Sequence, residues 1–89
     1  MDKNTAKAIC KRVLEASALA SQAGLVEDLA DPQVFRAQFL IFAQPLGNGE
    51  GERAAGAYPS LFTSVEEAKQ RGHRGRSLAD TAMAAISAR

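Results

Sequence analysis

The sequence predicts an all-α protein, a small bundle of three to four helices in one domain spanning residues 1–89, with a long loop at residues 45–60. Three observations predict this fold. Residues 5–23 are nearly all good helix formers. Asp31-Pro32 is a strong helix start. Ser64 and Glu67 have the spacing of a capping box, in which each side chain caps the other's backbone amide.

The composition matches an ordinary globular protein, with 46% hydrophobic and 24% charged residues. Eighty-nine residues are too few for a second core. Alanine supplies much of the apolar fraction, and large side chains for a core are few because there is no Trp and only four Phe. We therefore expect helices that approach one another closely.

The first predicted helix runs from Asn4 or Thr5 to Ala23, and Gly24 stands where a C-terminal cap would end it. One face follows the helical period and consists of Ile9, Val13, Ala16 and Ala20. Cys10 lies at the edge of this face. A cysteine there is more often a small buried hydrophobic residue than a nucleophile.

The second predicted helix runs from Pro32 to about Ala43. It carries Phe35, Phe39 and Phe42 on one face, and residues 39–43 are apolar all round. Such a stripe usually belongs to a core, and its second interpretation is an interface with a partner helix. Gln44-Pro45 ends the helix.

A strand is the alternative for this segment, because Phe35, Ala37 and Phe39 alternate with Arg36 and Gln38 before the alternation fails at Leu40. In that case residues 34–44 and 56–62 form a hairpin in an α+β fold. The Asp31-Pro32 start favours the helix. In the helical interpretation, residues 45–60 are a loop, because Gly47, Gly49, Gly51 and Gly56 interrupt a polar stretch that reaches Pro59.

The third predicted helix starts at Ser64 and ends at about Arg71, before Gly72. The last helix starts at Ser77, with Leu78, Met83 and Ile86 as its apolar residues. Between the two lies a basic turn for which contact with an anion or nucleic acid is the alternative interpretation; its candidate residues are Lys69, Arg71, His73, Arg74, Arg76 and Ser77. The spacing of a P-loop is not met. A solvated helix connector remains the simpler interpretation.

The net charge of +1 provides no chain-wide attraction for a polyanion, and residues 25–60 hold five acidic and two basic side chains. The single cysteine excludes an internal disulfide, and the single histidine makes a poor zinc ligand set. No apolar stretch suits a membrane span or a signal peptide. We therefore expect a cytoplasmic protein with no cofactor and no metal site.

These features favour a non-enzymatic protein–protein interaction module that associates with itself or another protein, with Phe35, Phe39 and Phe42 as the candidate interface. The alternative function is binding of nucleic acid or a phosphate ligand through the basic turn at residues 69–76. An enzyme ranks last, because the Ser, Cys and His residues form no readable catalytic set.

Overall fold

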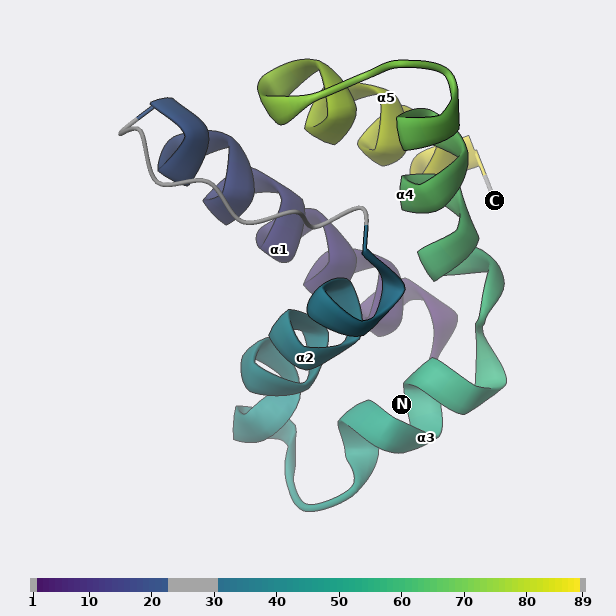
Figure 1. Ribbon diagram of the computed structural model, residues 1–89. Helices are drawn as coiled ribbons and strands as arrows, with labels where there is room; N and C mark the ends of the chain where they lie inside the picture. Colours follow the sequence, from purple (N-terminus) through teal and green to yellow (C-terminus); the bar gives the residue numbers. More distant parts are fainter. Residues whose placement is uncertain (1, 23–30, 89) are drawn as a thin grey trace.

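The computed structural model describes residues 2–22 and 31–88, which form five α-helices, one short 3-10 helix and no strand (Figure 1). The elements are α1 (Lys3–Gln22), α2 (Pro32–Ala43), η1 (Gln44–Leu46), α3 (Glu50–Ala57), α4 (Ser60–Gln70) and α5 (Gly75–Ala88). The all-α prediction is confirmed, but the expected count of three to four helices is not, because the described residues form five. The hairpin alternative is wrong, because residues 34–43, 56–57 and 60–62 are helical.

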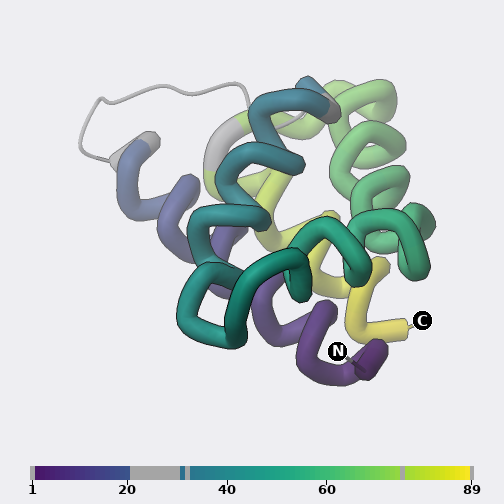
Figure 2. Tube along the Cα trace, turned by 90° about the horizontal axis from the view of Figure 1, so that it is seen from below, coloured from purple at the N-terminus to yellow at the C-terminus, as the bar shows by residue number. Residues whose placement is uncertain are grey.

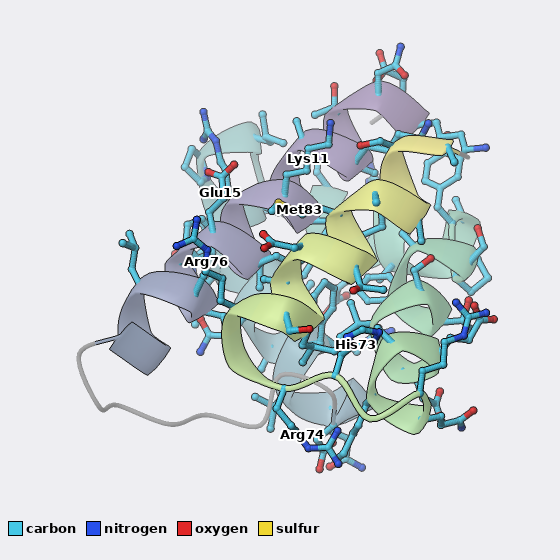
Figure 3. The ribbon with its side chains drawn as sticks, turned by 90° about the horizontal axis from the view of Figure 1, so that it is seen from above. Lys11, Glu15, His73, Arg74, Arg76 and Met83 are labelled. Atoms are coloured by element: carbon cyan, nitrogen blue, oxygen red, sulfur yellow. The ribbon has the colours of Figure 1, made fainter. Side chains whose placement is uncertain are left out.

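The longest of the described helices, α1, packs against α5 and α2. Its largest contact is with α5, which runs back along it in the opposite direction (Figure 3). Figure 2 shows the beginning of α1 beside the end of α5, as an antiparallel pair requires. On the other side α2 crosses α1, α4 packs against both α5 and α2, and α3 packs against α2.

A single core joins the helices. Phe35 and Phe39 of α2 are 1% and 0% exposed, and Phe62 of α4 meets both rings edge to face, at centroid distances of 5.3 and 5.2 Å. Such pairs add stability beyond the area they bury. The aromatic side chains therefore tie α2 to α4.

The pairing of α1 with α5 depends on small side chains. Ala6 and Cys10 of α1, and Ala79 and Ala82 of α5, are all at most 1% exposed. With so little volume between them the two backbones pack closely, which confirms the expectation drawn from the alanine content.

The apolar face of α1 differs in part from its prediction. Ile9 and Val13 are buried, but Ala16 is exposed and Ala20 is only half-buried. The buried residues are instead joined by Ala6, Cys10 and Leu14. The reason is that partner helices cover the first part of α1 most fully. The expected Gly24 cap lies outside the described residues.

The long loop expected at residues 45–60 is wrong, because residues 50–57 form α3. Gly47 and Gly49 adopt positive φ angles of 115° and 80° and make the turn that reverses the chain. Glu50 and Glu52 then occupy the first turn of α3, where acidic side chains interact favourably with the helix dipole. Gly51, Ala54 and Ala55 are buried.

The predicted start of α4 at Ser64 is also wrong. The helix begins at Ser60, directly after Pro59, whose φ of −62° suits a helix start. Ser64 is therefore an interior residue, 2% exposed, and its hydroxyl donates a hydrogen bond of 3.2 Å to the Ser60 carbonyl oxygen. Ser64 and Glu67 therefore have the spacing of a capping box, but they lie inside the helix and do not cap its start.

Two helix boundaries follow the prediction. Asp31 has extended backbone angles, and its carboxylate accepts a hydrogen bond of 2.8 Å from the Gln33 amide. At the other boundary, α4 ends before Gly72. None of the described helices is long and apolar enough to cross a lipid bilayer.

Candidate functional site

The basic turn between α4 and α5 is built on a Schellman motif, the common left-handed ending of a helix. Gly72 has a φ of 92°, and its amide donates to the Lys69 carbonyl oxygen at 2.9 Å. The next amide, of His73, donates to the Ala68 carbonyl oxygen at 3.2 Å. These two bonds satisfy carbonyls that the end of α4 would otherwise leave free.

Arg74 serves the same helix end with its side chain. Its guanidinium donates to the carbonyl oxygens of Lys69 at 3.1 Å and of His73 at 2.7 Å. A cation at this position also opposes the negative end of the helix dipole. Arg74, which the sequence predicted as an anion-binding residue, thus donates its hydrogen bonds to the protein's own backbone.

The α5 helix begins at Gly75, two residues before the predicted Ser77 start, and the Leu78 amide bonds to the Arg74 carbonyl oxygen at 3.3 Å. Ser77 therefore lies in the first turn rather than at the cap. Its hydroxyl oxygen is 2.7 Å from Nδ1 of His73. The two side chains form a hydrogen-bonded pair in the turn.

The basic side chains of this turn do not converge. Figure 3 shows His73, Arg74 and Arg76 on different sides of the turn, with Arg76 directed toward α1 on the side of Glu15. Nε of Arg76 is 3.9 Å from a carboxylate oxygen of Asp80, one helical turn further on. Arg71 is exposed and Lys69 half-buried. The segment is a set of separate cations rather than a formed pocket.

The predicted phenylalanine interface occupies the interior. Phe35 and Phe39 are fully buried, and Phe42 is half-buried and packs against the core. The large apolar side chains that the described residues present to water are instead Leu19 of α1, Ile41 of α2 and Leu46 of η1, which are 67%, 53% and 49% exposed.

Two hollows border α2. The first, which we call the α2–α4 hollow, has a volume of about 280 Å³ and is lined by Arg36, Ala55, Pro59, Phe62, Thr63 and Glu66. Ala55, which is buried, and Phe62, which is half-buried, contribute apolar side chains to its lining. Arg36 and Glu66 are exposed and place opposite charges on its α2 and α4 walls.

The second, which we call the α2-end hollow, has a volume of about 450 Å³ and lies where α2, η1 and α3 meet; its lining residues are Leu40, Ala43, Gln44, Gly47, Asn48, Gly49, Gly51 and Glu52. Its walls are more polar than those of the first hollow. Both hollows touch the same stripe of α2, because Arg36, Leu40 and Gln44 recur every four residues.

The sequence offered a signal for this surface that the phenylalanine stripe obscured. Ala37, Ile41 and Gln44 are exposed, on the side of α2 away from Phe35 and Phe39. Ile41 breaks an otherwise polar or small outer face. The run of residues 39–43 is apolar all round the helix, so it is wider than one buried face, and this pattern predicts that one of its apolar residues is exposed.

Cys10 sits away from both hollows, within the core. Burial raises the pKa of its thiol to about 12, which keeps it protonated and chemically unreactive at neutral pH. Among the described residues, no group of three or more His, Cys, Asp or Glu side chains is placed to hold a metal ion.

No family model, no curated protein and no solved structure matches this chain.

Proposed function

We propose that this protein is a non-enzymatic interaction module that associates reversibly with itself through the outer side of α2. The observation that carries the proposal is the exposure of Ile41 and Leu46, at 53% and 49%, near and just beyond the end of α2. Exposed large apolar side chains are typical of protein contact sites when they lie close together. The cytoplasmic location expected from the sequence is part of the same proposal.

The association is expected to be weak. The exposed surface of the chain is 5172 Å², and a folded monomer of its mass exposes about 5,000 Å². The largest aromatic side chains are already covered within one chain. The chain therefore folds without a second copy, and the interface between two copies is expected to be small. Small interfaces form transient complexes.

The test is sedimentation equilibrium across a concentration series from low micromolar to millimolar, at low and high salt. A monomer–dimer equilibrium that persists in high salt supports the proposal, because apolar contacts are not screened by ions. A monomer at every concentration contradicts it.

A second candidate function, contact with nucleic acid or another phosphate ligand, is favoured by the exposure of Arg71 and Arg76 beside the first turn of α5. With few free cations the salt dependence should be shallow. Titration of a short mixed-sequence oligonucleotide tests it. Binding that weakens with salt and is lost in Arg71→Ala/Arg76→Ala supports this function, and no binding at low salt excludes it.

A further inference from the structure

We propose that the α2–α4 hollow binds a small linear zwitterion, a molecule with an ammonium group at one end, a carboxylate at the other and an apolar chain between them. Arg36 binds the carboxylate, Glu66 binds the ammonium group, and Phe62 contacts the chain. This site is separate from the proposed self-association surface, because neither Ile41 nor Leu46 lines the hollow.

The hollow has the size and the lining of a site for a small molecule. Its volume of about 280 Å³ lies just below the range of about 300–1,000 Å³ that is typical of pockets for drug-sized ligands. Ala55, Pro59 and Phe62 contribute apolar side chains to its lining. Burial of methylene groups against such side chains favours binding. A ligand smaller than a drug, with an apolar part, therefore fits the hollow.

The Phe62 ring lies at the junction of the helix that carries Arg36 and the helix that carries Glu66. It meets Phe35 and Phe39 of α2 edge to face, at centroid distances of 5.3 and 5.2 Å. Arg36 directly follows Phe35 on α2, and Glu66 lies one helical turn after Phe62 on α4. Because the core holds the ring in place, this apolar surface exists before a ligand binds, which lowers the cost of binding.

The two charged side chains are available to a ligand. Arg36 and Glu66 both line the hollow and are exposed, and no ion pair joins them in the part of the chain that the structure describes. Thr63, the remaining polar residue of the lining, already donates its hydroxyl to the Ser60 carbonyl oxygen at 2.9 Å. A cation and an anion on two walls are complementary to a ligand that carries the reverse pair of charges.

The separation of the two walls sets the length of the ligand. The helices α2 and α4 pack against each other, and the axes of packed helices lie about 8–10 Å apart. Because Arg36 and Glu66 form no ion pair, a ligand that contacts both must bridge the gap between the helices. We therefore expect a chain of several methylene groups rather than an α-amino acid, whose two charged groups share one carbon atom.

The first experiment compares matched compounds at low salt and at a protein concentration where the chain is monomeric. The probe is 6-aminohexanoate, and binding is measured from the shifts of backbone amide signals in nuclear magnetic resonance spectra. We expect a Kd on the order of 1 mM, with the shifted signals at the residues that line the hollow. Hexanoate and hexylamine each lack one of the charges, and norleucine is an isomer with both charges at one end. All three should bind about tenfold more weakly or worse.

Two variants assign the charges to their residues. Arg36→Gln should weaken the binding of 6-aminohexanoate about tenfold without changing that of hexylamine, and Glu66→Gln should weaken it about tenfold without changing that of hexanoate. Because both positions are exposed, neither change should alter the thermal midpoint. The matched controls are Arg12→Gln and Glu15→Gln, which remove exposed charges of α1 and should leave binding unchanged.

A charge exchange tests the arrangement itself. Arg36→Glu and Glu66→Arg should each weaken binding, whereas the double variant should recover most of it, because a linear zwitterion can enter the hollow in the reverse direction. A double variant that binds no better than either single variant contradicts the site. So does a wild-type protein whose lining residues show no saturable shift, or one that binds norleucine as tightly as 6-aminohexanoate. These results would leave the proposed self-association standing, since it is measured without a ligand.

Discussion

The reactivity of the Cys10 thiol measures whether reagents in solution can reach the core. Its side chain is 0% exposed between helices, and burial raises the pKa of the thiol to about 12 from an ordinary value of 9.0. A protonated, enclosed thiol does not attack disulfide reagents. We expect an aromatic disulfide reagent to leave the native protein unlabelled at neutral pH and to label it rapidly in denaturant. Rapid labelling of the native state would contradict the closed core.

The same residue predicts a pH dependence of stability. A pKa that is higher in the folded state means that the folded protein holds its proton more tightly than the unfolded chain does. The stabilisation is therefore complete below pH 9.0 and is lost as the pH rises toward about 12. Urea unfolding across this range should show a steeper loss of stability in the wild type than in Cys10→Ala. Parallel curves would show that the thiol makes no contribution.

Arg74 is expected to matter for stability rather than for binding an anion. Its two hydrogen bonds to the carbonyl oxygens of Lys69 and His73 join α4 to the turn. Arg74→Ala should lower the free energy of unfolding by about 0.5–1.5 kcal/mol, measured by urea denaturation. The control is Arg71→Ala, at an exposed position, where a change within about 0.5 kcal/mol is expected. Equal effects of the two variants would argue against the capping role.

At the scale of elements, α3 contains two glycines, one with no room for a side chain and one with open space around it. A Cβ at Gly51 would lie 3.0 Å from the Cβ of Ala43 and 3.0 Å from Cδ2 of Leu40, whereas a Cβ at Gly56 would meet nothing within 4 Å. Ala43 Cβ is fixed to its backbone and cannot turn aside. The close approach of α3 to α2 therefore depends on Gly51.

The pair makes a matched prediction. Gly56→Ala should stabilise the protein by about 0.5–1 kcal/mol, because alanine has the higher helix propensity. Gly51→Ala makes the same propensity gain but adds an overpacking cost of about 1–3 kcal/mol. Thermal and urea unfolding of both variants would measure the difference. If the two variants are equally stabilised, α3 does not pack on α2 at this distance.

The elements that the sequence predicted well have signals contained in their own residues. The start of α2 follows from Asp31-Pro32, and the end of α4 follows from Gly72. The α3 helix was missed because its glycines suit a turn when considered alone, and only contact with Leu40 and Ala43 turns Gly51 into a packing residue. The start of α4 was misplaced because the helix begins at Ser60, directly after Pro59 and four residues before Ser64, the expected cap.

At the scale of the molecule, the candidate site was harder to predict than the fold. Periodicity shows that Phe35 and Phe39 share a face but does not say which partner covers it. Here Phe62, more than twenty residues away in the sequence, covers both rings. Likewise, the basic turn is evident in the sequence, but the backbone carbonyls that engage Arg74 exist only once α4 ends at Gly72.

The single core also predicts how the molecule unfolds. Phe39 of α2 and Cys10 of α1 belong to one buried cluster, so loss of packing at one should open the other. Phe39→Leu should lower the free energy of unfolding by about 1–2 kcal/mol. Cys10 should be labelled under conditions where the opened protein closes again faster than its thiol reacts with the reagent. The labelling rate should then rise about tenfold for each 1.4 kcal/mol by which the free energy of unfolding falls.

Ile41→Ala is the control for this prediction, since it changes an exposed residue of the same helix and should alter neither the urea midpoint nor the labelling rate at monomeric concentrations. If Phe39→Leu lowers the midpoint measured by circular dichroism but leaves Cys10 labelling unchanged, then α1 opens independently of α2. In that case the helices do not unfold as one cooperative unit.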